Sequence, residues 1–291
     1  MPVRQHHVGP VLVVTLDEPQ ARQALSAAVV AALHAMFSDL AARAPLPPDE
    51  AAAGLPDIGP GGRRPRAVVL RSTGGVFCAG AHLGEMAEAG RAGLEANLAA
   101  ARQLGAMFRA VHDCPVPVVA RVQGGAFGGG AGLAAACDLV VAGPGARFCF
   151  SETRLGLVPG VISPLVVERT GVARARDLFL TARTVDAAEA ARLGLVDRLA
   201  PAGGLDGAVE AVVDDLLKAG PVALGAAKRL LADVAELGYE VSEETCAQRI
   251  AEARSTAEAQ AALAAFAAKH PAPWTPAAGW SLAPCDGEER A

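Results

Sequence analysis

Two segments rich in small residues could present backbone N–H groups to a ligand. Residues 77–82 have the sequence FCAGAH and residues 124–132 have the sequence GGAFGGGAG; each follows a short apolar run. Glycine lets a ligand approach the backbone closely, and the N–H groups at the start of a helix favour negative charge. Two such donors aimed at one carbonyl oxygen would form an oxyanion hole. The residues alone equally permit two small-residue turns that only allow close packing.

The second glycine-rich segment also suggests a different chemistry. Residues 130–135 match G-x-G-x-x-A, the pattern of dinucleotide-binding turns, and Glu152 follows at about the expected ~20 residues. However, seven residues separate Val122, the end of the preceding apolar run, from Gly130, so the tight strand-to-helix turn is missing. The sequence therefore disfavours a dinucleotide-dependent oxidoreductase, which remains an alternative.

The composition is that of a globular chain and disfavours several other classes. Of 291 residues, 52% are hydrophobic and 20% charged, and the net charge of −5 argues against nucleic-acid binding. No stretch reaches the ~18 apolar residues of a membrane span, and the N-terminus lacks the apolar region of a secretory signal. The six cysteines form no C-x-x-C pair. We expect a cytoplasmic protein with reduced thiols and no metal site.

Hydrophobic periodicity indicates short buried strands that alternate with helices. The runs of apolar and β-branched residues predict strands at 11–16, 67–71, 116–122, 139–142 and 148–150. Helical spacing predicts helices from Ser26, an N-cap, to Leu40, over most of 84–112, and at 133–136, 163–180, 186–193, 205–219, 221–236 and 242–268. This alternation is typical of an α/β fold with helices packed outside the sheet.

The same patterns divide the chain into regions. We expect a core over residues 1–200, interrupted at 45–66 by an insertion rich in Pro, Gly and Ala. A helical region should follow over residues 201–270. Residues 271–291 show no pattern and are expected to form a loose tail, which Trp274 and Trp280 could anchor.

The order of the motifs resembles that of the enoyl-CoA hydratase/isomerase (crotonase) superfamily. The matching segments are 22–25 (RQAL, with Gln23 where the family carries Asn), 68–70 with 77–81, 117–130, 137–139, 151–160, 180–183 with Ala190, and 193–196. The resemblance spans roughly residues 10–270. It implies a crotonase-type spiral of ββα units with a C-terminal helical region, assembled as a homotrimer or hexamer. It also implies an acyl-CoA substrate and no cofactor beyond the CoA of that substrate.

The resemblance assigns roles to individual residues. The N–H groups of Ala81 and Gly129 would form the oxyanion hole for a thioester carbonyl, and Glu152 would transfer the proton. The residues expected along CoA are Arg22, Ala24, His82, Leu83 and Gly84. Arg22 could instead be a solvated surface residue, His82 a helix-capping residue, and Glu152 a partner of Arg147 or Arg154.

One departure from the family pattern leaves the reaction open. Hydratases of the family carry a second glutamate at the position of Gly132, so only Glu152 remains here. Some hydratases of the family also have glycine there, and residues 154–167 look most like methylglutaconyl-CoA hydratases. We expect a hydratase that adds water in the syn sense to a 2-enoyl-CoA, including branched or carboxylated acyl groups. The alternatives are an enoyl-CoA double-bond isomerase that uses a single glutamate and an inactive CoA-ester-binding scaffold.

Overall fold

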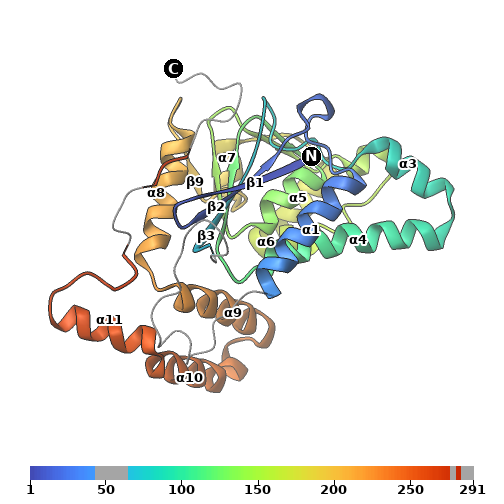
Figure 1. Ribbon diagram of the computed structural model, residues 1–291. Helices are drawn as coiled ribbons and strands as arrows, with labels where there is room; N and C mark the ends of the chain where they lie inside the picture. Colours follow the sequence, from blue (N-terminus) through green and yellow to red (C-terminus); the bar gives the residue numbers. More distant parts are fainter. Residues whose placement is uncertain (43–64, 276–279, 283–291) are drawn as a thin grey trace.

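A computed structural model describes residues 1–42, 65–275 and 280–282. It shows a twisted sheet with helices on both faces, and a helical arm formed by the C-terminal part of the chain (Figure 1). This confirms the predicted α/β class. The expected insertion at 45–66 lies outside the described residues except for Pro65 and Arg66.

The main sheet has six strands in the order β1-β2-β3-β4-β6-β9. Their bounds are β1 Val3–Val8, β2 Val11–Leu16, β3 Ala67–Ser72, β4 Val118–Val122, β6 Leu139–Ala142 and β9 Arg198–Leu199. β1 is antiparallel to β2, and the other neighbours are parallel. The central four strands were predicted. β1 was missed because it is an edge strand in which only Val3 is buried, and β9 because it has two residues.

The central strands are mostly apolar and buried because both faces of the sheet are covered, with Thr15, Arg71, Ser72 and Arg121 as buried polar exceptions. In β2, Leu12 and Val14 belong to a large core shared with α1, α4, α5 and α6, whereas Val11 and Val13 face a smaller core under α8. Parallel strands buried on both faces read as continuous hydrophobic runs, which is what made these strands recognisable in the sequence.

Seven α-helices precede the C-terminal arm in the described part of the chain. They are α1 Ala27–Ala42, α3 Leu83–Arg91, α4 Leu94–His112, α5 Gly129–Ala136, α6 Ser163–Thr181, α7 Ala187–Leu193 and α8 Leu205–Lys218. The Ser26 hydroxyl accepts a hydrogen bond from the Val29 N–H at 3.3 Å, so the predicted N-cap of α1 is confirmed. The helix expected over most of 84–112 is two helices, α3 and α4, because the chain leaves the helical conformation at Gly93, where φ is +92°.

A second, three-stranded sheet brings two motifs together. Its order is β5-β7-β8, with bounds Gly125–Phe127, Arg147–Cys149 and Val185–Asp186. β5 runs into α5, and β7 runs into a 3-10 turn, η2, at Glu152–Leu155. Because β5 and β7 are parallel neighbours, the start of α5 and Glu152 emerge at the same edge. The hydrogen bond from the Gly128 N–H to the Cys149 carbonyl, 2.7 Å, joins the two exits.

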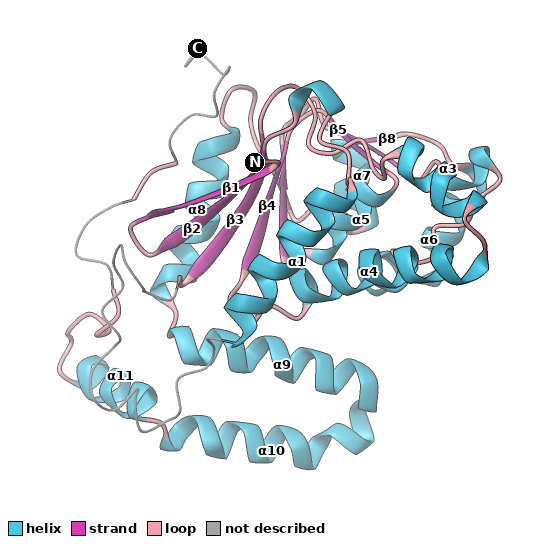
Figure 2. Cartoon of the chain, turned by 45° about the vertical axis from the view of Figure 1, so that its right-hand side comes forward, coloured by secondary structure: helices cyan, strands magenta, loops and turns pink. Residues whose placement is uncertain are grey.

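The C-terminal helices form an arm that stands apart from the main sheet (Figure 2). The arm consists of α9 Pro221–Leu237, α10 Tyr239–Ser255 and α11 Ala257–Ala267. The single helix expected over 242–268 is broken at Thr256, whose hydroxyl caps α11 by accepting a hydrogen bond from the Ala259 N–H. Large apolar side chains of the arm remain exposed, among them Val241, Ile250 and Phe266. Among the described helices, none combines the length and the apolar character that a bilayer crossing requires.

The segment expected to be a loose tail is tied to α8 at its described positions. The Trp274 indole donates a hydrogen bond to the Lys218 carbonyl at 3.0 Å, and the Trp280 indole donates to the Asp214 carboxylate at 2.8 Å. Leu282 is buried in the smaller core. The two tryptophans thus anchor residues 271–275 and 280–282, as their large apolar surfaces and single polar atoms allow.

Candidate functional site

The structure brings the two small-residue segments into contact. Gly80 has a φ of +96°, and a Cβ at this position would lie 2.6 Å from the Phe127 carbonyl oxygen and 3.4 Å from the Gly129 nitrogen. The Ala81 nitrogen lies 3.7 Å from the position that a Cβ on Gly129 would take. Only glycine at position 80 permits this approach, because any side chain there would collide with backbone atoms.

The N–H groups of Ala81 and Gly129 have no acceptor among the described residues. Ala81 pairs with Leu25 in an isolated parallel bridge. In this bridge Leu25 donates to the Gly80 carbonyl at 2.8 Å and accepts from the His82 N–H at 3.4 Å, so the N–H of Ala81 itself points away from Leu25. Gly129 is the first residue of α5, where an N–H has no partner within the helix. Two free donors therefore lie beside each other at a helix N-terminus.

Glu152 lies against the residue that precedes Gly129. A Cβ on Gly128 would be 3.1 Å from the Glu152 Oε1 atom, and the φ of Gly128 is +51°, which favours glycine. The other carboxyl oxygen, Oε2, is buried and has no hydrogen-bond partner. Burial raises the pKa of the Glu152 carboxyl above its ordinary value. An unpaired buried carboxyl oxygen is costly for folding, so it points to a group that meets a proton or a ligand.

Neither arginine that sequence reasoning offered as a surface partner pairs with Glu152. No ion pair joins Glu152 to another described residue. The Arg147 guanidinium donates to the Ala146 carbonyl, and Arg154 is exposed. The turn that carries Glu152 is held instead by Thr153, whose hydroxyl donates a hydrogen bond to the Phe179 carbonyl of α6 at 2.8 Å. Glu152 is thus fixed by its turn, and its Oε2 atom is left without a hydrogen-bond partner.

The position of the missing second glutamate is filled by an apolar side chain. A Cβ on Gly132 would lie 2.2 Å from the Cγ2 atom of Ile162. Ile162 is only 1% exposed and belongs to the main core. A side chain at position 132 therefore requires the core to move, and a glutamate does not fit beside Ile162 as it stands.

The residues expected along CoA lie around one cavity. This cavity has a volume of about 500 Å³ and is lined by Ala21, Arg22, Ala24, Ala79, Ala81, His82, Leu83, Gly84 and Phe127. All five residues that the family resemblance assigned to CoA line this cavity, together with Ala81. Ala21 and Phe127 were not singled out in the sequence, and Ala79 was noted only as part of residues 77–82, without a role. Ala79 and Phe127 were nevertheless detectable, because they belong to the two small-residue segments.

His82 acts as a helix cap at the mouth of this cavity. Its Nδ1 atom accepts a hydrogen bond from the Glu85 N–H at 3.3 Å at the start of α3. The Glu85 carboxylate in turn accepts from the Ala27 N–H, the first residue of α1, at 2.7 Å. The capping alternative for His82 is therefore realised, and the side chain also lines the cavity.

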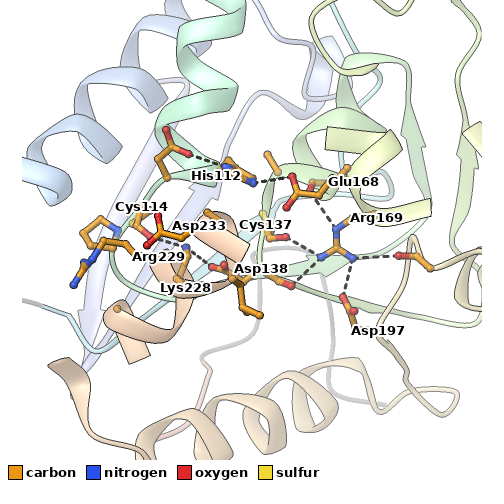
Figure 3. A pocket seen from close by; sticks show the side chains of 18 residues that line it. His112, Cys114, Cys137, Asp138, Glu168, Arg169, Asp197, Lys228, Arg229 and Asp233 are labelled. Atoms are coloured by element: carbon orange, nitrogen blue, oxygen red, sulfur yellow. Dashed lines mark hydrogen bonds and ion pairs between the residues drawn. The ribbon is translucent and has the colours of Figure 1, made fainter. Parts of the chain in front are cut away.

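A second, larger pocket is lined by charged residues (Figure 3). Its volume is about 670 Å³. The Asp138 carboxylate accepts hydrogen bonds from the Val118 N–H and the Lys228 ammonium, both at 2.7 Å. Arg169 donates to the carbonyls of Cys137 and Asp138 and forms an ion pair with Asp197. These central charges satisfy one another, so the Cys137-Asp138-Leu139 motif has a structural role here.

Known proteins resemble this chain over nearly its whole length. The family model described as Enoyl-CoA hydratase/isomerase matches residues 61–277. A Thermus thermophilus relative whose name refers to enoyl-CoA hydratase is 36% identical over 263 residues, 90% of this chain and 96% of that protein. The structure of Pseudomonas aeruginosa AtuE has a TM-score of 0.83 at 35% identity, covering 95% of this chain and 100% of its own. An enoyl-CoA hydratase/isomerase from Marinobacter aquaeolei has a TM-score of 0.82 at 31% identity, covering 94% of this chain and 99% of its own.

Proposed function

The chain belongs to the enoyl-CoA hydratase/isomerase family and is an enzyme that acts on acyl-CoA, and we propose that it adds water reversibly to 2-enoyl-CoA thioesters. One observation supports this most directly. The Glu152 carboxyl, with one buried oxygen that has no partner, lies against Gly128, the residue before Gly129, and the N–H groups of Gly129 and of the neighbouring Ala81 are free. This combination can hold a thioester carbonyl and move a proton next to it.

The two N–H groups stabilise the charge that develops on the thioester oxygen. Addition of an oxygen nucleophile at C3 pushes electrons onto the carbonyl oxygen and forms an enolate. Hydrogen bonds from Ala81 and Gly129 to this oxygen strengthen as the negative charge grows, and each such donor is typically worth ~2.7–4 kcal/mol in the transition state. The positive end of the α5 dipole lies at Gly129 and acts in the same direction.

Glu152 serves first as a base and then as an acid. In its ionised form it takes a proton from water, and the water oxygen forms the bond to C3. The protonated carboxyl then gives that proton to C2 of the enolate, which restores the carboxylate. Both additions occur from the side of the one carboxyl, which explains a syn outcome. The raised pKa of Glu152 brings it nearer the pH at which such proton transfer is efficient.

The cavity next to Ala81 is proposed to receive the CoA part of the substrate. His82, Leu83 and Gly84 line it on one side and Arg22 and Ala24 on another. Arg22 is exposed at this cavity and offers a guanidinium to a CoA phosphate. We propose no cofactor, because the carboxyl and the two N–H groups supply the acid, the base and the charge stabilisation.

Isomerisation of the double bond is the second candidate. Ile162 fills the place beside Gly132, so the site has one carboxyl and an apolar wall where a second would stand. One carboxyl is sufficient to move a proton between C4 and C2 of a 3-enoyl thioester, and this reaction needs no water. The two reactions share the same oxyanion hole and the same base, and they differ in the substrate, in the need for water and in the product.

A product assay separates the two reactions. The purified protein is mixed with crotonyl-CoA in deuterated water and followed by absorbance of the conjugated enoyl band and by proton NMR. Loss of the band with a 3-hydroxyacyl product is the expected result, after which methylglutaconyl-CoA tests the carboxylated class. Growth of the band from a 3-enoyl-CoA, with crotonyl-CoA unchanged, would establish the isomerase instead. Binding of CoA esters without turnover of any of them would support an inactive scaffold.

We also propose that the chain assembles into a homotrimer or a hexamer of two trimers. The arm formed by α9, α10 and α11 exposes Leu231, Val241, Ile250 and Phe266 to solvent in the single chain, with exposed fractions of 71%, 65%, 50% and 84%. Neighbouring copies that cover these side chains would remove apolar surface from water. Light scattering coupled to size-exclusion chromatography tests this proposal, and a monomer across micromolar concentrations would contradict it.

A further inference from the structure

We propose that Gln23 is a positioning residue that holds the Ala81 N–H in its catalytic orientation. This inference rests on the proposed role of Ala81 in binding the thioester oxygen. Gln23 lies outside the cavity lining and touches no atom proposed to react. Its influence would pass through the short segment 22–25, which lies directly beside Ala81.

The Gln23 side chain is buried and joins two parts of the chain. It is 1% exposed. Its amide oxygen accepts a hydrogen bond from the Glu18 N–H at 2.8 Å, and its amide nitrogen donates to the Thr73 carbonyl at 2.7 Å and the Thr73 hydroxyl at 3.0 Å. Thr73 directly follows β3, so the amide ties the loop after β2 to the end of the neighbouring strand.

These bonds hold an unusual backbone conformation. Arg22 and Gln23 both have positive φ values, +52° and +59°, in the left-handed region that residues other than glycine rarely adopt. Two consecutive residues in this region persist only where the surroundings over-determine them. The buried amide of Gln23 supplies that constraint, because its two ends are bonded to fixed backbone groups on either side.

The left-handed turn delivers the next residues to Ala81. The Arg22 carbonyl accepts a hydrogen bond from the Ala79 N–H at 3.1 Å, and the Leu25 N–H donates to the Gly80 carbonyl at 2.8 Å. Leu25 is the residue whose bridge turns the Ala81 N–H away from segment 22–25. The Leu25 Cδ1 atom also lies 3.2 Å from the position of a Cβ on Gly129. Segment 22–25 therefore contacts both donors of the oxyanion hole.

The chain offers a matched control in Gln123. Its amide nitrogen donates to the Ser72 carbonyl, the Ser72 hydroxyl and the Gly74 carbonyl at 2.9–3.1 Å, and its oxygen accepts from Arg121. Gln23 and Gln123 thus both hold the turn after β3. Gln123 makes no hydrogen bond to segment 22–25, so its loss affects the turn without releasing that segment.

The test compares Gln23→Met with Gln123→Met, since methionine keeps the shape and removes the hydrogen bonds. Steady-state kinetics give kcat and KM for the substrate that the wild type turns over. Infrared difference spectra of bound butyryl-CoA, labelled with ¹³C at the thioester carbonyl, report how strongly the two N–H groups polarise that carbonyl. This saturated thioester cannot be hydrated, so the spectrum is independent of the reaction catalysed.

For Gln23→Met we expect kcat to fall about 10²-fold, KM to change little, and the carbonyl band to move toward its position in free butyryl-CoA. For Gln123→Met we expect a lower melting temperature with kcat and the band of the wild type. Wild-type kcat and band position in Gln23→Met would overturn the inference, as would equal losses in both variants. If Gln23→Met does not fold, Gln23→Asn, whose shorter amide cannot span both partners, is measured against the same criteria. A wild-type band that does not shift on binding would instead refute the oxyanion hole itself.

Discussion

The cavity beside Ala81 and the charged pocket around Lys228 use polar groups in opposite ways. The cavity is lined mostly by small and apolar residues, and the polar groups beside it, two N–H groups and one carboxyl oxygen, have no partner among the described residues. In the pocket, Lys228, Asp138, Arg169 and Asp197 satisfy one another. Unpaired groups cost stability and remain available to a substrate, whereas paired groups stabilise the fold and leave little for a ligand to bind.

The largest expected effect is on turnover, and it appears when one glutamate in each region is replaced by glutamine. Glu152→Gln should fold normally and lose about 10³-fold in turnover, because general acid–base catalysis contributes ~10²–10⁴-fold. Glu168→Gln, which alters an exposed carboxylate of the charged pocket, is the control and should keep wild-type turnover. Steady-state assays with equal amounts of folded protein measure both. Near-wild-type turnover in Glu152→Gln would remove Glu152 from the mechanism.

Breaking an ion pair in the charged pocket should lower the stability of the fold and leave turnover unchanged. Lys228→Met leaves the partly buried Asp138 without its ammonium partner and should lower the free energy of unfolding by about 2 kcal/mol, since hydrogen bonds to charged groups are worth ~1.5–3 kcal/mol. Urea denaturation measures this loss. Turnover per folded molecule should be unchanged. Wild-type stability in this variant would contradict the stabilising role of the ion pair. A stable variant without turnover would show that the charged pocket also serves catalysis.

The close packing of Ile162 beside Gly132 can be tested by its effect on stability. Gly132→Ala places a methyl group 2.2 Å from the Ile162 Cγ2 atom and should destabilise the fold by about 1–3 kcal/mol, the usual cost of overpacking. Adding Ile162→Ala should recover part of that loss, and a double-mutant cycle measures the coupling. The same clash leads us to expect that Gly132→Glu alone lowers stability and does not improve hydration. Additive effects of the two alanine substitutions would contradict the contact.

The smallest expected effect is a pH dependence of stability. The pKa of Glu152 is raised in the folded state, so the folded protein binds this proton more tightly than the unfolded chain does. Its ionisation therefore destabilises the fold as pH rises from the unfolded pKa, near 4.5, through the folded pKa, and the penalty is constant above that. Glu152→Gln should be more stable than the wild type at pH 7 and equally stable at pH 4. Melting temperatures at the two pH values test this, and an equal difference at both would contradict the raised pKa.

Much of the fold was predictable because the buried strands and the amphipathic helices carry strong local patterns. The central strands of the main sheet were recognised as apolar runs, Ser26 as a cap, and the crotonase-type fold from the order of its motifs; the structural likenesses confirm this fold. Residues 125–127 and 185–186 carried no strand signal, because these strands pair only in the assembled tertiary structure.

The site was predictable in its residues but not in its contacts. The sequence did not show that Ala81 meets Gly129, because that contact depends on positive φ at Gly80 and on the bridge from Leu25. Nor did it show that Ile162 fills the space beside Gly132, since the two residues belong to different helical segments. The substitution of Gln for the family's Asn at position 23 was visible, but its bonds to Glu18 and Thr73 required the structure.

Exchange of the C2 protons of butyryl-CoA in deuterated water tests the central claim most directly. The claim is that one unpaired carboxyl and two free N–H groups act together on the carbon next to a thioester carbonyl. This exchange needs both parts and does not depend on whether the enzyme is a hydratase or an isomerase. The wild type should replace one C2 proton with deuterium well above the uncatalysed rate, and Glu152→Gln should not. Exchange at the uncatalysed rate in the wild type, or undiminished exchange in Glu152→Gln, would contradict the account.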